Sequence, residues 1–344
     1  RPSTTTTAPL AATITGPKPF NTVGGQTLFT PTPTPTATLP LPPRSPPPPA
    51  PPPSAEHIQQ CEILAEFFFA ARGNSWRNHT GWLSEPSCCD WFGVRCNAAQ
   101  LVTHVDMAYN QLDGTIPTSF AGIKSLEYLN LNQNPLSGTL PASWSSLGAL
   151  VTLQLAGTQL SGSVPATWSM LDVLRKLDLS TTGLSGVLTE RVFGQKAKFE
   201  DLNLGFTAIS GTLPVDLCRN NLDSLIIGST RLSGTLPPQV GMLDQLDYLY
   251  LDKTHISGTI PPQIRDARRL VDLDLEATRI SGTVPPELSA LVRLDYLNLG
   301  RATRLSGTLP RELGVLPRLD YMDFEDTSVS GTIPAEIGNL AATD

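Results

Sequence analysis

The sequence predicts an α/β solenoid, a right-handed superhelix of about ten repeats of about 24 residues, with a parallel sheet on the concave side and a disulfide-bonded cap at its N-terminal end. Three observations predict this fold. A Gly-x-aliphatic-Pro step recurs every 23 to 25 residues, apolar residues stand at fixed positions before each of these glycines, and a segment rich in cysteine and tryptophan precedes the first repeat. A unit this short cannot bury its apolar face alone, so the units must stack.

Residues 1–54 form the first predicted segment and are dominated by threonine and proline, ending in the runs Pro46–Pro49 and Pro51–Pro53. Proline fixes φ and has no N–H donor, so the segment cannot form a helix or a central strand. Its few apolar side chains cannot offset the entropy lost on ordering. We expect an extended, polyproline-II-like stalk, whose composition is also that of O-glycosylated stalks. An unmodified disordered linker is the alternative.

Residues 101–344 carry the repeats, about ten in number, and a period of 23 to 25 residues lies in the range of leucine-rich repeats. Aliphatic or aromatic residues stand 12, 9, 7 and 2 positions before nine of the ten glycines, as Leu270, Leu273, Leu275 and Ile280 do before Gly282. In the unit of Gly307 one added residue moves the first three of these positions back by one. The pair two apart predicts a short strand with both side chains inward. A further apolar residue follows each proline and is predicted to fill the core: Phe120, Trp144, Trp168, Leu217, Val240, Ile264, Leu288, Leu313 and Ile337. The copy at Gly186 lacks the proline.

Residues 55–100 are predicted to cover the exposed edge of the first strand. Ile58, Leu64 and Phe68 fall on one face of a predicted helix together with Cys61. The segment ends in Cys88-Cys89-Asp90-Trp91-Phe92-Gly93-Val94-Arg95-Cys96. Four cysteines allow three pairings, and the sequence alone does not choose among them.

This ending resembles the N-terminal cap of plant-type leucine-rich-repeat proteins, with its Cys-Cys-x-Trp-x-Gly-Val-x-Cys motif, and the resemblance extends over residues 55–344. It implies the disulfides Cys61–Cys88 and Cys89–Cys96. Two disulfides in turn imply an oxidising compartment.

The position four residues before the glycine departs from the plant-type repeat, which carries asparagine there. Only Asn110 and Asn134 keep it. The other eight units carry threonine at this position. Together with the Pro-x-x-Trp-Ser of two units, this threonine pattern resembles the promastigote surface antigen family of kinetoplastid protists. The resemblance implies a glycolipid-anchored or shed surface protein with a threonine-rich stalk. In that family the stalk follows the repeats, whereas here it precedes them. The eight threonines at this position are Thr158, Thr182, Thr207, Thr230, Thr254, Thr278, Thr303 and Thr327.

The charge of the chain argues against nucleic acid as a partner, and its hydropathy argues against a membrane-spanning segment. It has 24 basic and 31 acidic side chains, and nucleic-acid binding needs basic surface. No run of about 18 apolar residues is present, so nothing in this segment is expected to span a bilayer. We expect an extracellular or cell-surface protein whose membrane attachment lies outside this segment.

The tyrosines point to a binding surface on the concave face, where a solenoid presents the side chains between its inward leucines. Tyrosine favours interfaces because it is rigid and amphipathic. A general preference of aromatic residues for strands is the alternative explanation. All six tyrosines are predicted to occupy these outward positions: Tyr109, Tyr128, Tyr248, Tyr250, Tyr296 and Tyr321.

Units seven to ten are also acidic on this face, so the sequence predicts a basic protein or peptide as partner, or a glycan. A solvated face that maintains solubility remains an alternative, as does a divalent cation held by Asp272, Asp274 and Asp323. The basic residues Arg265, Arg268, Arg269, Arg293, Arg311 and Arg318 are expected toward the convex side. The proposed ligand-binding carboxylates are Asp247, Asp252, Asp272, Asp274, Asp320 and Asp323.

The sequence contains no nucleophile motif, phosphate loop or metal-spaced His/Cys cluster. We therefore expect no enzyme activity, cofactor or metal, and a role in recognition outside the cell. A receptor ectodomain of the kinase type and a secreted hydrolase inhibitor are the alternatives. Cys218 is expected to be a buried free thiol, and Asn78-His79-Thr80 is an N-glycosylation sequon on a predicted surface loop.

Overall fold

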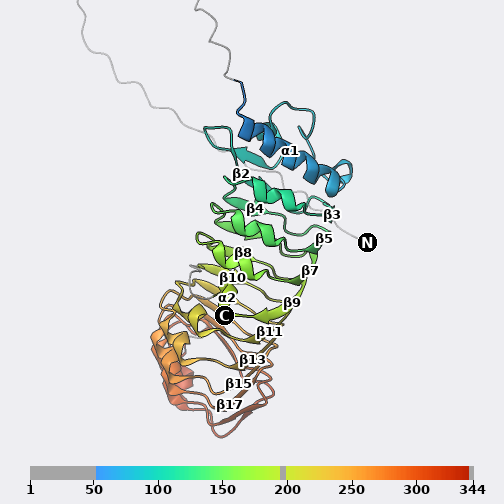
Figure 1. Ribbon diagram of the computed structural model, residues 1–344. Helices are drawn as coiled ribbons and strands as arrows, with labels where there is room; N and C mark the ends of the chain where they lie inside the picture. The colour runs from blue at the N-terminus through green and yellow to red at the C-terminus, as the bar shows by residue number, and fades with distance from the viewer. Residues whose placement is uncertain (1–51, 194–198, 341–344) are drawn as a thin grey trace, which may run out of the picture. The chain divides into compact units, whose positions relative to one another are not determined.

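The structure is a computed structural model that describes residues 52–193 and 199–340 (Figure 1). The predicted stalk, residues 1–54, lies almost wholly outside these residues. The cap begins with α1 (Ala55–Ala70). The Ser54 side chain starts the helix by accepting from the His57 N–H at 3.1 Å. Phe67 and Phe68 are buried on its inner face, where Phe68 packs edge-on against Trp76 with ring centroids 5.0 Å apart.

The disulfides Cys61–Cys88 and Cys89–Cys96 are present as predicted. They join α1 to the short 3-10 helix η2 (Cys88–Asp90) and η2 to β1 (Val94–Cys96). A further 3-10 turn, η1 (Gly73–Ser75), follows α1. β1 pairs antiparallel with β2 (Val102–Asp106), so the cap supplies a strand that covers the first edge of the repeat array.

The predicted concave sheet is confirmed. After β1 its order is β2-β4-β6-β8-β10-β12-β14-β16-β18-β20, and these strands pair in parallel (Figure 1). Equivalent residues of successive units face one another, as Leu225, Leu249 and Leu273 do. Beyond β2 the strands are β4 (Tyr128–Asn130), β6 (Thr152–Gln154), β8 (Lys176–Asp178), β10 (Asp201–Asn203), β12 (Ser224–Ile226), β14 (Tyr248–Tyr250), β16 (Asp272–Asp274), β18 (Tyr296–Asn298) and β20 (Tyr321–Asp323).

A second parallel sheet, which the sequence analysis did not predict, is formed by the Ser-Gly-Thr segments. From Ser137 to Ser306, the serine before each anchor glycine donates a hydrogen bond to the preceding anchor carbonyl, as Ser257 Oγ does to the Gly234 carbonyl at 3.0 Å. The strands are β3 (Gly114–Thr115), β5 (Leu136–Thr139), β7 (Gln159–Ser163), β9 (Gly183–Leu188), β11 (Ala208–Thr212), β13 (Arg231–Thr235), β15 (His255–Gly258), β17 (Arg279–Thr283), β19 (Arg304–Gly307) and β21 (Ser328–Val329).

The convex side consists of short 3-10 helices that begin directly after the repeat proline, which fixes the backbone at their N-caps. The predicted core residues after the prolines are buried except Ile337, which is partly exposed. The fourth unit has Thr189 in place of the proline and forms the α-helical turn α2 (Glu190–Phe193) instead. The 3-10 helices are η3 (Thr118–Gly122), η4 (Ala142–Ser146), η5 (Ala166–Met170), η6 (Val215–Arg219), η7 (Pro238–Met242), η8 (Pro262–Asp266), η9 (Pro286–Ala290), η10 (Arg311–Val315) and η11 (Ala335–Asn339).

One continuous apolar core runs from the cap through the repeats. Cys218 is buried in it as a free thiol, and burial raises the pKa of this thiol to about 12. None of the helices in the described residues is both long enough and apolar enough to cross a bilayer.

Candidate functional site

Strands β14, β16, β18 and β20 place the predicted binding residues in two parallel rows on the concave face. Their registers set Tyr248, Asp272, Tyr296 and Tyr321 side by side, and Tyr250, Asp274, Asn298 and Asp323 beside them. These eight residues are called the tyrosine–aspartate patch. They come together because the units stack in register and strand residues two apart point to the same face.

Contacts within the patch hold its aromatic rings in place. The Tyr250 hydroxyl donates to Asp272 Oδ2 at 2.6 Å, and the Tyr296 ring stacks on Tyr321 with centroids 4.5 Å apart and planes 8° apart. Asn298 Nδ2 donates to the Tyr296 hydroxyl at 3.1 Å. The rings of Tyr248 and Tyr321 remain exposed, so the patch offers two open aromatic surfaces beside tyrosines whose hydroxyls are hydrogen-bonded.

The Asp274 carboxylate lies at the most acidic point of the patch. Burial raises its pKa to about 6, although a hydrogen bond from the Glu276 N–H opposes the shift. The nearby carboxylates of Asp252 and Glu276 raise this pKa further. Burial and the bond to Asp272 likewise raise the pKa of Tyr250, so the tyrosine is a neutral donor at physiological pH.

Two basic residues border the patch. Lys253 Nζ lies 2.9 Å from Glu276 and 3.5 Å from Asp252, and Arg301 pairs with Glu276 at 3.1 Å. Asp252, a predicted site residue, therefore shares a cation, whereas Asp272, Asp274 and Asp323 form no ion pair with any described residue. Within the patch, these three carboxylates carry the negative charge that no described cation pairs with.

The structure corrects three of the predicted positions. Tyr109 is not on a strand: it lies in the turn after β2 with a left-handed φ of 55°. Arg269 and Arg293 do not face the convex side but pair with Asp247, Arg269 through two bonds of 3.1 and 3.0 Å and Arg293 at 3.5 Å. Because neighbouring units stack in register, Arg269 before β16 and Arg293 before β18 both reach Asp247, which directly precedes β14.

The remaining predicted residues lie outside the patch. Tyr128 is on β4, where its ring stacks on His104 with centroids 5.6 Å apart. Asp320 is exposed directly before β20. Asn298 was missed by the sequence analysis, although it occupies the same repeat position as Asp274 and Asp323. Aligning the units by their strand leucines, Leu273 with Leu297, gives the signal that identifies it.

Within the described residues, the cluster with metal-ligand spacing is His57, Cys61 and Cys88. Cys61 and Cys88 are bonded to each other, so neither offers a thiolate to a metal. Asp272, Asp274 and Asp323 do not bring three carboxylate oxygens within such spacing, and the alternative of a divalent cation there gains no support.

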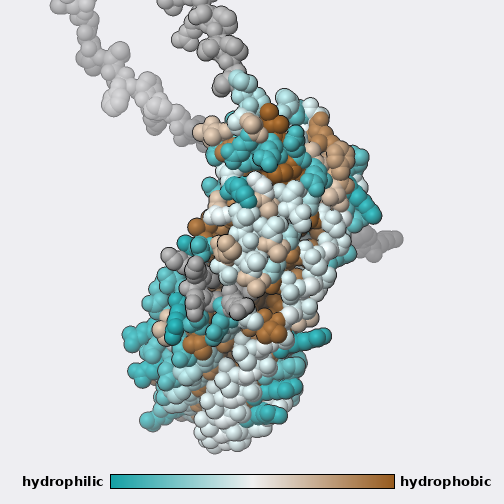
Figure 2. Space-filling view, viewed as in Figure 1, coloured by the Kyte–Doolittle hydropathy of each residue, from teal (hydrophilic) through white to brown (hydrophobic). Residues whose placement is uncertain are grey.

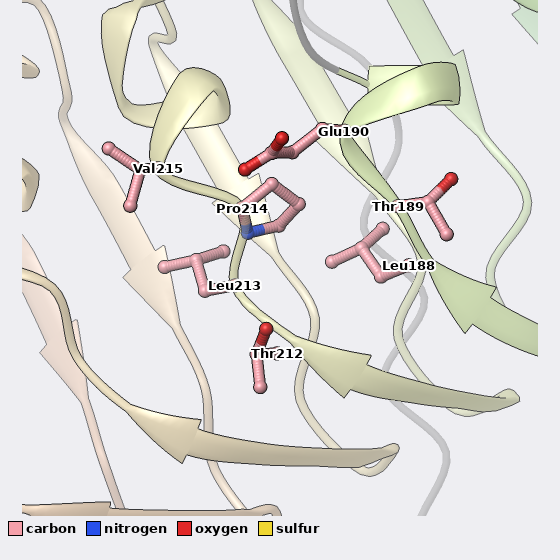
Figure 3. A pocket seen from close by; sticks show the side chains of 7 residues that line it. All are labelled: Leu188, Thr189, Glu190, Thr212, Leu213, Pro214 and Val215. Carbon is pink, nitrogen blue, oxygen red and sulfur yellow. The ribbon is translucent and has the colours of Figure 1, made fainter.

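Two pockets lie away from the patch. One, of about 440 Å³, opens on the convex flank between Leu188–Glu190 and Thr212–Val215, where the fourth unit lacks its proline (Figure 3). The other, of about 340 Å³, is the apolar end of the repeat array and includes Met322, Phe324 and Ile333. Neither brings charged groups together, so the patch remains the candidate binding surface.

The comparisons with known proteins agree with this architecture. Residues 100–160 match the family described as leucine rich repeat, and no curated protein matches the sequence significantly. The ectodomain of the Arabidopsis receptor kinase HAESA, solved with an extended IDA peptide hormone, is 29% identical with a TM-score of 0.74, covering 83% of this chain and 48% of that chain.

Two other solved structures extend the comparison. The PEPR1–AtPEP1 complex is 26% identical with a TM-score of 0.68, covering 82% of this chain and 44% of that chain. A plant ice-binding protein shares the fold at 24% identity and a TM-score of 0.70, covering 81% of this chain and 89% of that chain. This chain thus spans less than half the length of the two receptor ectodomains. Repeat sequence, disulfide-bonded cap and solved structures together show a leucine-rich-repeat solenoid that is similar to the ectodomains of plant receptors.

Proposed function

We propose that the protein is an extracellular recognition protein that binds an extended, basic peptide segment on the tyrosine–aspartate patch. The observation that carries the proposal is the pair of rows on β14, β16, β18 and β20, in which four tyrosines lie beside three carboxylates that form no ion pair with a described residue. Four strands about 4.8 Å apart span roughly 14 Å, the length of about four extended residues. Lysine or arginine side chains of such a segment have both carboxylates and aromatic faces within reach.

The relatives support a peptide as the ligand class. The HAESA and PEPR1 ectodomains are solved with a peptide hormone and with AtPEP1 respectively, so a solenoid of this type can hold a peptide. Their ligands are not transferred to this chain, because it spans less than half of each. The basic character of the ligand is inferred from Asp272, Asp274 and Asp323 alone.

The cap supports an extracellular location because its two disulfides persist in oxidising compartments. Display at a cell surface, as in the promastigote surface antigens that the threonine-bearing repeat resembles, belongs to the same proposal. So does glycosylation at Asn78, whose Oδ1 accepts from the Thr80 N–H at 3.0 Å on the cap surface. Removal of one N-linked glycan by a glycosidase from protein secreted by eukaryotic cells tests this point, and a mass unchanged by the enzyme contradicts it.

The binding proposal is tested by selecting a displayed library of linear peptides on the full chain. We expect selected peptides to be rich in lysine and arginine and to lose affinity steeply with added salt. The triple variant Asp272→Asn, Asp274→Asn, Asp323→Asn should bind them at least about tenfold more weakly, because charge-assisted hydrogen bonds contribute about 1.5–3 kcal/mol each.

A matched control removes the same charge from the convex side: Asp172→Asn, Asp244→Asn, Asp266→Asn. These aspartates are exposed in or next to η5, η7 and η8, and this variant should keep full affinity. A companion variant, Tyr248→Ala with Tyr250→Ala, should weaken capture with little change in melting temperature. Equal affinity of all four proteins, or selection of peptides without basic residues, contradicts the proposal.

A further inference from the structure

The second sheet carries a row of basic side chains that the concave site does not use. Arg231, His255, Arg279 and Arg304 each occupy the first position of their strands, β13, β15, β17 and β19. Each stands three residues before an anchor glycine, and all four are exposed. These four residues are called the basic row. The row occupies four consecutive units and is absent from the corresponding positions of the others, which hold no lysine or arginine.

The three arginines of the basic row have no partner among the described residues. None of them forms an ion pair or a side-chain hydrogen bond, whereas Arg269 and Arg301 are paired on the concave side. The strands of the second sheet from β5 to β19 contain no aspartate or glutamate. Positive charge is therefore uncompensated within this sheet, in a chain whose net charge is −7.

Small hydroxyl side chains surround the basic row. The strand registers place Ser233 beside His255, Ser257 beside Arg279 and Ser281 beside Arg304. In the four units that carry the basic row, the position after the anchor glycine holds an exposed threonine whose hydroxyl makes no hydrogen bond to a described residue. These threonines are Thr235, Thr259, Thr283 and Thr308.

The resulting surface is open and even. Figure 2 shows a broad, pale band of intermediate hydropathy with hydrophilic side chains projecting in a row along one edge, where Figure 1 labels β11 to β17. Neither described pocket includes a residue of the basic row. A ligand on this surface is held by charges and hydroxyl groups spread along several strands rather than enclosed in a cavity.

We propose that the basic row binds a linear polysaccharide bearing carboxylate groups, a polymer of uronic acids, laid across β13 to β19. The planar guanidinium of arginine matches a carboxylate through two parallel bonds. The threonine hydroxyls are free to bond the sugar hydroxyls. A sideways step of one strand and a slip of two residues separate successive basic positions by roughly 8 Å, so only an extended polymer reaches several of them at once.

The composition of the face favours a polysaccharide over other anionic polymers. Strands β13, β15, β17 and β19 expose arginine, histidine, serine and threonine, but no phenylalanine, tyrosine or tryptophan. Single-stranded nucleic acids need aromatic platforms for base stacking, and protein partners anchor mainly on buried aromatic and apolar side chains. A sugar polymer needs neither. This inference does not rest on the proposed peptide site, which lies on the other sheet.

The test measures binding of the full chain to immobilised polygalacturonate in low salt, with neutral dextran as a control surface. We expect binding to polygalacturonate but not to dextran, with affinity falling as salt rises. The variant Arg231→Gln, Arg279→Gln, Arg304→Gln should bind at least about tenfold more weakly, because three charge-assisted contacts are lost. Thr235→Val with Thr259→Val should weaken binding by a smaller factor, because valine keeps the shape of threonine without its hydroxyl.

The matched control is Arg265→Gln, Arg268→Gln, Arg311→Gln, which removes the same charge from exposed positions on or beside η8 and η10 and should bind normally. The concave triple aspartate variant should also bind normally, which separates this inference from the peptide proposal. Equal weakening by the two arginine variants, no binding to polygalacturonate, or equal or tighter binding of dextran sulfate or single-stranded DNA overturns the assignment.

Discussion

At the scale of the single residue, Asp274 shows how position in the stack changes the chemistry of a side chain. The same repeat position is held by Asp323 in the tenth unit, at the end of the array, and by Asn298 in the ninth. Asp274 is packed between neighbouring strands on both sides, and burial raises its pKa to about 6. The folded protein therefore binds this proton more tightly than the unfolded chain does. Stability from this group is greatest at low pH and falls as the pH rises from about 4 to about 6.

Asp274→Asn should therefore stabilise the protein at neutral pH and leave it almost unchanged near pH 4. The amide resembles the protonated acid and removes the cost of a charged carboxylate, which we place at about 1 kcal/mol after allowing for solvent screening. Thermal melts of both proteins between pH 4 and 8 measure this difference. Asp172→Asn, which removes the same charge from an exposed position on the convex side, is the control. A destabilised Asp274→Asn protein at pH 7 contradicts the explanation.

Sequence periodicity predicted which side chains share the concave face, but not how they interact. Asp247 and Asp274 are equally acidic in the sequence, yet Asp247 is paired with two arginines and Asp274 forms no ion pair with a described residue. The partners of Asp247 come from the next two units, so their contact depends on the stacking register and cannot be derived within one repeat. Tyr109 was misplaced because its strand ends at Asp106.

At the scale of the element, replacing asparagine by threonine changes how each turn is held. Asn134 accepts from the N–H groups of Asn110 and Leu112 at 3.0 Å and donates to the Met107 carbonyl at 2.8 Å, all in the preceding unit. Thr254 donates only to the Leu251 carbonyl of its own unit, at 2.7 Å. Threonine therefore satisfies fewer backbone groups than asparagine does at this position. In units that carry threonine, this position no longer links one unit to the next.

Asn134→Ala should therefore cost more stability than Thr254→Ala. The first leaves several buried backbone groups without partners, at about 2–4 kcal/mol, and the second removes one main bond at about 1 kcal/mol. Both side chains are almost fully buried, so differences in exposure do not confuse the comparison. Denaturant unfolding of the two variants measures it, and equal losses of stability rule out this role for asparagine.

The second sheet was the element that sequence analysis failed to predict. Its strands contain glycine, which has low strand propensity, and the repeated Gly-x-aliphatic-Pro step indicated a bend. Gly258 has a φ of 79°, and a Cβ added there would lie 2.9 Å from Thr235 Cγ2. Glycine is therefore required by the close approach of neighbouring units, and the strand is stabilised by stacking rather than by local preference. The basic row went unnoticed for the same reason.

At the scale of the whole repeat array, most contacts join neighbouring units, so a change should stay near its origin. The sequence predicted this organisation well, because the apolar positions and the plant-type cap motif recur with little variation. It could not assign the surfaces, since two sheets with opposite charge share the same repeat and only their arrangement in space separates them.

The double variant Cys61→Ser, Cys88→Ser tests this local character. The disulfide closes a loop with a sequence separation of 27 residues, and its loss should cost about 3 kcal/mol. Hydrogen exchange should rise in α1 and β1 to β4 but stay unchanged in β14 to β20, and selected peptides should still bind. Increased exchange throughout the repeats contradicts the prediction.

The registers of the two sheets differ, and this difference sets the path that the array follows. In the concave sheet Leu225 lies opposite Leu249, its equivalent in the next unit, whereas in the second sheet Ser233 lies opposite His255, two repeat positions earlier. At each repeat the second sheet therefore shifts about 6.6 Å farther along its strand direction than the concave sheet does. The stack of units therefore forms a twisted superhelix. A straight, rigid partner can follow one column of side chains for only a few units before the column turns away from it. Additional units in such an array present their side chains in new directions and do not lengthen a straight column of side chains.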